Sequence, residues 1–230
     1  MRRRSQTSPT TRRRWAGRAS LALTVALLAG APSRVLAQQT NPVYVDDSIA
    51  AAEAIARSIE LSASGNHAEA SRVLQRVLDE DAERLLPVEG RPSLFRPVRD
   101  VVHETLLARP ALLEEYRALE AVEAQRLLRE NTAPTDERVE RSRLLTTPGF
   151  DAALRVAQRR VERAQFWSAL RVLASLERHP DLEGDRLERA LALASRAAEY
   201  LRAQGEGEDA GGAAAVVEAL ARAGGVPAPT

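Results

Sequence analysis

The histidines are the first candidates for chemistry, because imidazole binds metals and transfers protons near neutral pH. They are His67, His103 and His179, and the chain has no cysteine that could join them as a ligand. A metal site also needs ligands that converge, yet Leu107 rather than a ligand stands four residues after His103. We therefore predict no metal, cofactor or catalytic role for any histidine. We expect His67 to fill a turn and His179 to contact the C-terminal end of its own helix.

The remaining polar motifs also favour structural roles over catalytic ones. Glu114 and Glu115 are adjacent, so on a helix their side chains point to different faces, which predicts a solvated surface. The serines lack the strand–turn–helix setting of a nucleophile elbow. The glycine-rich stretch at residues 205–212 has no lysine and no preceding strand, so we expect a flexible loop between helices. The chain is predicted not to be an enzyme, and an enzyme is the least favoured alternative.

Aromatic residues are the candidates for partner contact. At least one of Phe166 and Trp167 should pack between helices, and the other is then exposed. We take Trp167 and Tyr116 as possible contact residues, with burial of the rings as the alternative. A basic stretch lies just before Phe166 and predicts a solvated helix face or, alternatively, an anion site. Its members are Arg155, Arg159, Arg160 and Arg163.

Two distant segments carry the same apolar pattern, which identifies the elements that would position these side chains. Apolar residues recur at offsets of 0, 3, 4 and 7, the stripe of an amphipathic helix. The first set is Ala70, Val73, Leu74 and Val77, and the second is Ala169, Val172, Leu173 and Leu176. Each stripe follows a turn and an earlier helix, whose apolar residues are Ile49, Ala52, Ile55 and Ile59 in the first case and Phe150, Ala153, Leu154, Ala157 and Val161 in the second. The repeated unit is therefore helix, tight turn, helix.

Capping residues support these helices. Asp46 or Asp47 can cap the first helix, and Thr147 followed by Pro148 offers a cap and a proline at the first helical position. A weaker third pair follows, with apolar positions Leu187, Ala190, Leu191, Ala194, Ala198 and Leu201 and a second helix at residues 213–223. Between the pairs we expect helices that begin near prolines, and no segment alternates as a strand would. Pairs of this kind bury their stripes only against stacked neighbours, which predicts an all-α solenoid of about nine helices.

Charge divides the chain into two parts. Residues 1–37 hold eight of the 33 arginines and no acidic residue, so the rest has 25 arginines against 32 acidic residues and a net charge of −7. The basic start, the apolar run Ala19–Ala31 and the small residues Val35 and Ala37 are typical of a cleaved signal peptide. An uncleaved anchor is the alternative, although the run is short for a hydrocarbon core of about 30 Å. The acidic remainder argues against nucleic acid and anionic membrane surfaces as partners. We expect no stable membrane span once the signal peptide is cleaved.

The predicted organisation follows from these observations. We expect a signal peptide at 1–37, a linker at 38–46, a first helix pair at 47–86, irregular middle helices at 87–146, a second pair at 147–180, a third pair at 181–224 and a tail at 225–230.

The helix pairs resemble tetratricopeptide repeats. In that pattern a turn glycine, an aromatic residue two positions on and a small residue at the close helix contact recur. Gly65 fits the turn and His67 stands in the aromatic position, whereas the second copy has Ala164 and Phe166 there. The repeat's tryptophan and proline are missing, so the copies are degenerate. The resemblance implies protein binding.

A second resemblance spans roughly residues 44–204. The segments that carry it are residues 68–78, 112–128 and 147–153. They resemble the exported helical head that precedes a pyrroloquinoline-quinone-type β-propeller in planctomycete-like envelope proteins. No blade repeat follows up to Thr230, so no quinone-binding residue can be carried over.

These considerations predict an exported, non-catalytic scaffold of the periplasm or cell envelope that binds a protein partner. The alternative is the head of a truncated or split propeller protein, for which the partner is a β-propeller domain.

Overall fold

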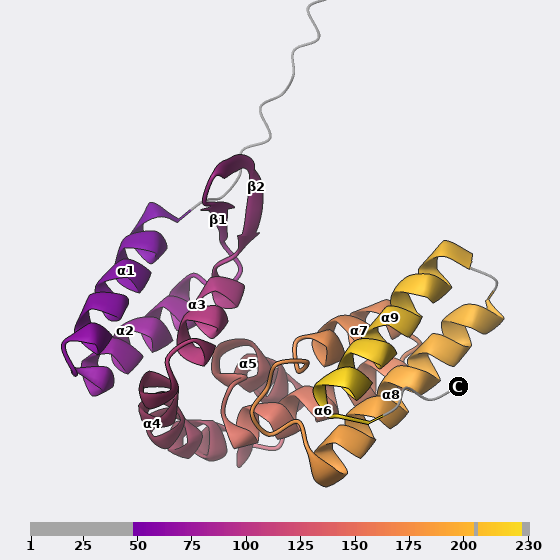
Figure 1. Ribbon diagram of the computed structural model, residues 1–230. Coiled ribbons are helices and arrows are strands. Elements are labelled where there is room, and N and C mark those ends of the chain that lie inside the picture. Colours follow the sequence, from indigo (N-terminus) through magenta and orange to yellow (C-terminus); the bar gives the residue numbers. More distant parts are fainter. Residues whose placement is uncertain (1–47, 205–206, 227–230) are drawn as a thin grey trace, which may run out of the picture. The chain divides into compact units, whose positions relative to one another are not determined.

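The computed structural model describes residues 48–204 and 207–226, which contain nine helices and one β-hairpin (Figure 1). They lie within one compact unit, Tyr44–Thr230. The expected signal peptide, the linker, Asp46 and Asp47 fall outside the described residues. The prediction of a mostly helical chain is confirmed. In chain order the elements are α1 (Ile49–Ala63), α2 (His67–Glu80), β1 (Leu85–Val88), β2 (Arg91–Pro97), α3 (Val98–Leu107), α4 (Pro110–Leu128), α5 (Ala133–Arg143), α6 (Thr147–Glu162), α7 (Phe166–Ala174), α8 (Gly184–Ala203) and α9 (Gly207–Ala223).

Packing between neighbours along the chain dominates the arrangement. Helix α1 packs on α2, α5 on α6, α6 on α7 and α8 on α9, while α4 lies against α2, α5 and α6 (Figure 1). Most helices therefore bury their apolar stripe against a helix that is adjacent in the chain, whereas α4 packs most extensively on α2.

The turns of the first and second helix pairs have the same geometry. Gly65 and Ala164 both take a left-handed conformation, with φ of 84° and 57°. In each turn this residue donates its N–H to the carbonyl three positions back, and the next residue donates to the carbonyl five positions back, with N···O distances between 2.8 and 3.0 Å. This is the hydrogen-bonding that ends a helix at a left-handed residue. The two turns thus bring the second helix of each pair back in the same way.

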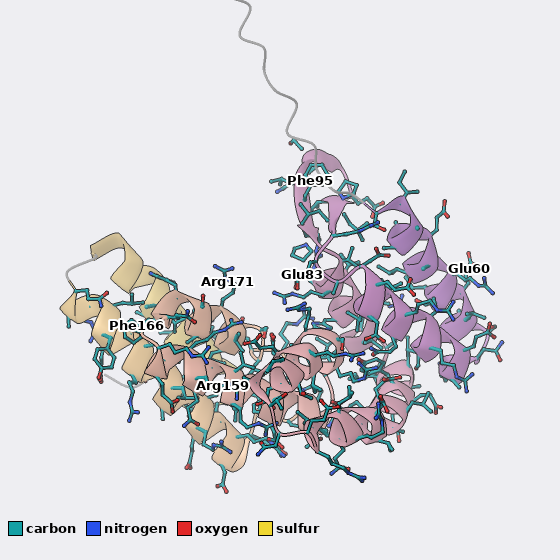
Figure 2. All side chains as sticks on the ribbon, turned by 180° about the vertical axis from the view of Figure 1, so that it is seen from behind. Glu60, Glu83, Phe95, Arg159, Phe166 and Arg171 are labelled. Atoms are coloured by element: carbon teal, nitrogen blue, oxygen red, sulfur yellow. The ribbon has the colours of Figure 1, made fainter. Side chains whose placement is uncertain are left out.

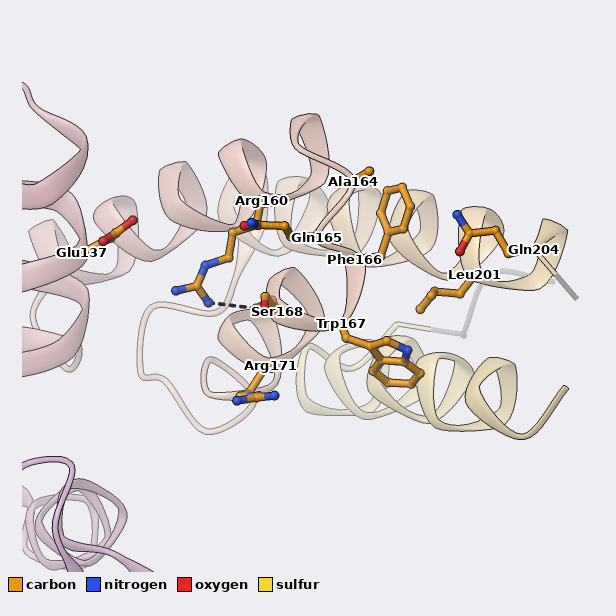
Figure 3. A pocket seen from close by; sticks show the side chains of 10 residues that line it. All are labelled: Glu137, Arg160, Ala164, Gln165, Phe166, Trp167, Ser168, Arg171, Leu201 and Gln204. Carbon is orange, nitrogen blue, oxygen red and sulfur yellow. Dashed lines mark hydrogen bonds between the residues drawn. The ribbon is translucent and has the colours of Figure 1, made fainter. Parts of the chain in front are cut away.

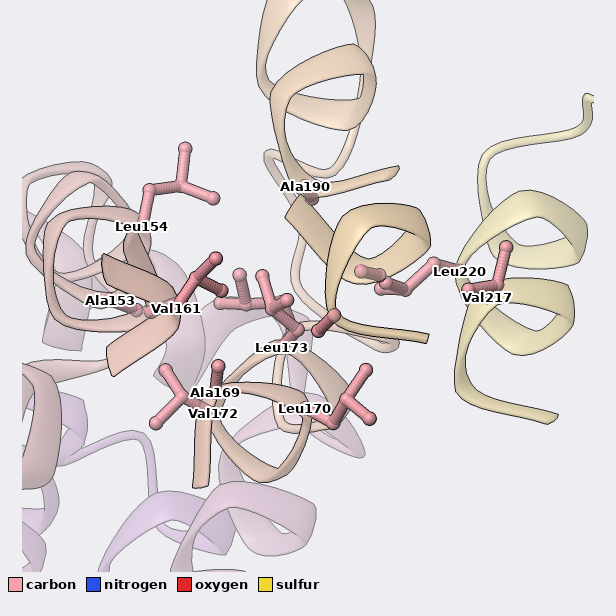
Figure 4. Close-up of a cluster of buried hydrophobic side chains, with 14 of the residues drawn as sticks. Ala153, Leu154, Val161, Ala169, Leu170, Val172, Leu173, Ala190, Val217 and Leu220 are labelled. Atoms are coloured by element: carbon pink, nitrogen blue, oxygen red, sulfur yellow. The ribbon is translucent and has the colours of Figure 1, made fainter. Parts of the chain in front are cut away.

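The two apolar stripes face inward in both pairs. Ala70, Leu74 and Val77 are buried and Val73 is half-buried. In the second pair all four positions are buried, and they join a cluster that includes residues of α6, α8 and α9 (Figure 4). Its members in α7 are Ala169, Leu170, Val172 and Leu173, followed by Leu176.

Helix α1 buries a different face from the one expected. Ile49 is 71% exposed and Ala52 is exposed, so neither belongs to the stripe. The buried face instead combines apolar residues in its first half with serines in its second half, namely Ala51, Ile55, Ser58 and Ser62. The Ser58 hydroxyl donates to the Ile55 carbonyl at 2.7 Å, which lets a polar side chain lie in the interior. The helix is capped by Ser48, whose hydroxyl accepts from the N–H of Ala51.

The start of α6 is one residue earlier than expected and lies very close to α5. Thr146, not Thr147, is the cap, and its hydroxyl accepts from the N–H of Gly149 at 3.0 Å. A Cβ at position 149 would overlap the carbonyl of Arg143 at the end of α5. Only glycine therefore permits this approach of the two helices.

The middle region is not wholly helical, and the prediction of no strand is wrong. Strands β1 and β2 pair antiparallel, with Leu85 opposite Pro97 and Leu86 opposite Arg96. Gly90 forms the tight connection with φ of 73°. The hairpin is rich in prolines and arginines, and Val88 is its single β-branched residue, so no alternating pattern marks it in the sequence. Leu86 is buried.

The glycine-rich segment also differs from its expected role as a loop. Helix α9 begins at Gly207, so most of this segment is helical, and α9 as a whole packs with α8.

The buried apolar residues fall into three clusters. One joins α1–α4 with β1 and Leu145, a second joins the α6–α9 region with Leu144, and a small third one contains Ala124, Leu127, Val139 and Ala152. Ion pairs of Arg143 and Asp136 connect helices that belong to different clusters.

Candidate binding groove

His179 is a buried structural residue whose two ring nitrogens are both occupied. Nε2 lies 2.9 Å from the carbonyl of Leu144, and Nδ1 accepts from the N–H of Asp181 at 2.9 Å. These partners require the neutral ring protonated at Nε2. Burial lowers the pKa of His179 to about 4, although the Asp181 carboxylate opposes this shift. The acceptor belongs to the end of α5, so the expected contact with the end of its own helix is wrong.

The other histidines also serve packing. Burial lowers the pKa of His103 to about 3, and the charge of Arg99 adds to the effect. His67 begins α2, and its Nδ1 lies 3.2 Å from the Ser62 hydroxyl across the turn. Within residues 48–204 and 207–226 no three His, Asp or Glu side chains gather as metal ligands would.

Tyr116 is buried, so the prediction that it contacts a partner is wrong. Its hydroxyl donates toward Gln75 Oε1 at 3.0 Å and the Ser142 carbonyl at 3.3 Å. Burial raises the pKa of Tyr116 well above its usual value. The ring thus connects α2, α4 and α5 inside the chain.

Arg143 extends this internal network. Its Nε donates to Glu120 at 3.0 Å, and its Nη1 donates to Asp79 at 3.2 Å and to Ser142 Oγ at 2.8 Å. The side chain is 7% exposed, so its charge depends on these partners. Burial raises the pKa of Glu120, while Arg143 opposes that rise.

Two arginines of the basic stretch of α6 form ion pairs with a buried carboxylate. Arg155 and Arg159 both donate to Asp136, which lies buried in the first turn of α5, at distances of 2.7 Å and 2.6 Å. These two side chains therefore hold α6 to α5, and neither a purely solvated face nor an anion site describes them.

Phe166 and Trp167 divide their roles as one of the two interpretations predicts. Phe166 is buried and stacks on Tyr200 of α8, with ring centroids 4.9 Å apart. Trp167 is 36% exposed. Its indole passes over Gly212 of α9, where an added Cβ would lie 3.2 Å from the ring.

Trp167 borders a hollow of about 550 Å³ (Figure 3). The floor comes from Phe166 and Leu201, and the rim is polar. Arg160 reaches across it, and its Nη1 donates to the Ser168 carbonyl at 3.0 Å. The other lining residues are Glu137, Ala164, Gln165, Arg171 and Gln204.

A second hollow of about 370 Å³ shares Arg160 and Arg171 with the first, so the two meet at these side chains. It continues past α7 to Arg99, Arg141 and Glu83, and Glu140 and Val172 complete it. Figure 2 labels two of its lining residues, Arg171 on α7 and Glu83 in the connection between α2 and β1. We call these two adjacent hollows together the α7 groove.

The groove carries four arginines and three glutamates. Glu140 is 8% exposed, and burial raises its pKa, although Arg99 and Arg160 oppose the rise. Glu83 lies 3.7 Å from Arg99 and 3.6 Å from Arg141. The lining therefore favours anionic groups over cationic ones.

The sequence pattern pointed to Trp167 but not to the groove's charged residues. Arg99, Arg141 and Arg171 come from three different helices, and nothing in their local spacing brings them together. The α-helical period of α7 places Trp167 and Arg171 on one face, which was the available signal.

The chain matches no protein-family model, and neither a curated protein nor a solved structure matches it. No helix within the described residues is both long and apolar enough to cross a membrane.

Proposed function

We propose that this chain is a non-catalytic, tetratricopeptide-like scaffold that acts in the cell envelope and binds an extended segment of a protein partner in the α7 groove. The carrying observation is that Trp167, next to the buried Phe166, stays exposed over a hollow floored by apolar side chains. Exposed aromatic residues in concave sites are frequent anchors of protein interfaces.

Comparison of the two helix pairs supports a dedicated binding role for the second. When Ala70 is aligned with Ala169, Trp167 corresponds to Ala68 of the first pair. The repeated fold is therefore formed without a tryptophan at this position. A large aromatic side chain that the repeat does not need for packing is well suited to contact a ligand.

A selection with random peptides displayed on phage tests the proposal. Peptides enriched on the wild-type chain should lose binding to Trp167→Ala, because the apolar anchor of the groove is removed. An Ala68→Ser variant, changed at the equivalent position of the first pair, should bind them normally. Peptides that bind wild-type and Trp167→Ala chains equally well, or a selection that enriches none, would contradict the proposal.

Export is the second part of the proposal and rests on the basic and apolar character of residues 1–37. Expression of the full chain in a bacterial host should give a cell-envelope form that begins at Gln38. Mass spectrometry of the envelope and cytoplasmic fractions measures this, and an unprocessed cytoplasmic chain would contradict it.

A further inference from the structure

Arg171 is the cation of the α7 groove that has no partner among the described residues. Its guanidinium takes part in no ion pair or side-chain hydrogen bond there, and the side chain is exposed. The other three arginines are engaged: Arg160 bonds to the Ser168 carbonyl, and Arg99 and Arg141 lie near Glu83. Arg171 is therefore the groove's best-placed group for a ligand carboxylate.

Trp167 and Arg171 lie one helical turn apart on α7, and both line the first hollow (Figure 3). Four residues of an α-helix advance about 6 Å along its axis. In an extended peptide, side chains two residues apart point to the same face and lie about 6.6 Å apart. One extended segment can thus place one side chain on the indole of Trp167 and the side chain two residues further along on the guanidinium of Arg171.

We infer that the α7 groove selects an extended acidic protein segment in which an aromatic or large apolar residue lies two positions from an aspartate or glutamate. The inference rests on the proposed function and specifies its ligand. A second acidic residue further along would meet Arg99 and Arg141, whose present partner Glu83 is exposed. These two arginines can exchange an exposed ion pair for a ligand carboxylate at small cost.

The charge distribution favours a protein ligand over nucleic acid. Glu83, Glu137 and Glu140 line the groove together with the arginines, so a continuous phosphate backbone would also meet repulsion. Outside residues 1–37 the chain carries a net charge of −7, which disfavours polyanions at longer range. A short peptide with one or two carboxylates satisfies the arginines without approaching all three glutamates.

Fluorescence of Trp167 provides a direct readout, because the chain's other tryptophan is Trp15. The full chain carrying Trp15→Phe is titrated with three synthetic peptides that share the core Phe-Gly-X, in which X is Asp, Asn or Lys. The Asp peptide should change the indole emission and bind about fivefold more tightly than the Asn peptide, with the Lys peptide weakest. High salt should remove the preference for Asp.

Charge reversal at Arg171 is the decisive variant. Arg171→Glu should invert the order, so that the Lys peptide binds best. Arg72 occupies the equivalent position of the first helix pair and is exposed, so Arg72→Glu is the matched control and should leave the order unchanged. Both substitutions are on the surface, and circular dichroism should show the same helix content as the parent chain.

Three outcomes overturn the inference. They are equal binding of the Asp and Asn peptides, an order that survives Arg171→Glu, and no emission change with any of the three peptides. The phage selection remains independent of these results: peptides that depend on Trp167 but lack acidic residues would sustain the proposed function while this inference fails.

Discussion

Gly65 and Ala164 occupy the same left-handed position at the ends of α1 and α6, although only glycine adopts it without strain. No neighbouring atom decides the residue type at Gly65, because an added Cβ there meets nothing within 4 Å. The same turn is thus formed by a favourable residue in one pair and by a strained one in the other.

Exchanging the two residue types should have opposite effects. Gly65→Ala should lower the free energy of unfolding by about 0.5–1 kcal/mol, and Ala164→Gly should raise it by a similar amount. The steric cost of a left-handed alanine exceeds the entropy that glycine adds to the unfolded chain. Urea denaturation of each variant measures both values, and shifts of the midpoint in the same direction would contradict the assignment.

Gly149 should be intolerant of any side chain. Gly149→Ala would place a Cβ against the Arg143 carbonyl and force α5 and α6 apart, with an expected loss of about 1–3 kcal/mol. The control is Gly211→Ala in α9, where an added Cβ meets nothing within 4 Å and alanine favours the helix by about 1 kcal/mol. Thermal unfolding compares them. A neutral effect of Gly149→Ala would show that the helices do not approach so closely.

Acid should destabilise the chain through His103 and His179. Their pKa values in the folded chain are about 3 and about 4, below the usual 6.5. At a pH between the folded value and 6.5, each histidine is therefore protonated more in the unfolded chain than in the folded one. The stability from each neutral ring is complete above pH 6.5 and is lost as the pH falls toward the folded pKa. Between pH 7 and pH 5 the loss should be about 1–2 kcal/mol per histidine.

Urea unfolding over this pH range measures the loss. His179→Gln supplies the control, since an amide donates and accepts without titrating. The slope of the unfolding free energy against pH should then correspond to one proton fewer taken up on unfolding. An unchanged slope in this variant would rule out His179 as a source of the acid sensitivity.

Arg143 should be among the most sensitive positions. Arg143→Met keeps much of the volume but leaves the half-buried Glu120 and the exposed Asp79 without their common partner, so we expect a loss of about 1–3 kcal/mol. Adding Glu120→Gln should recover part of it, because one uncompensated carboxylate is removed. A double-mutant cycle by urea denaturation measures the coupling, and purely additive effects would argue against the network.

Sequence periodicity predicts α6, α7 and α8 well because their buried positions are apolar or small. It also finds the apolar stripe of α2, but not the burial of Ser71 and Gln75 beside that stripe. It fails for α1, where Ser58 and Ser62 lie on the buried face and Ile49 lies outside it. A small hydroxyl that bonds to its own helix can be buried at little cost, and a pattern that counts serine as polar misses this. The β-hairpin escapes prediction because its prolines and arginines resemble a loop.

The groove could be predicted only in part. Trp167 stood out because it adjoins an aromatic residue that the repeat buries. The roles of Arg160 and Arg171 depend on how α6 and α7 pack, and Tyr116 was misassigned because only the tertiary structure supplies Gln75 and Ser142 as partners for its hydroxyl.

The separation of the apolar interior into clusters bears on how the chain unfolds. Arg143 links α5 to α2 and α4, and Asp136 links α5 to α6, so ionic contacts through α5 connect elements of the α1–α4 cluster with those of the α6–α9 cluster. Unfolding is less cooperative between parts that are joined by ionic contacts than between parts that share one continuous apolar core. Backbone amides of α2 and of α6 should therefore exchange with solvent through two distinct opening reactions, each with its own free energy.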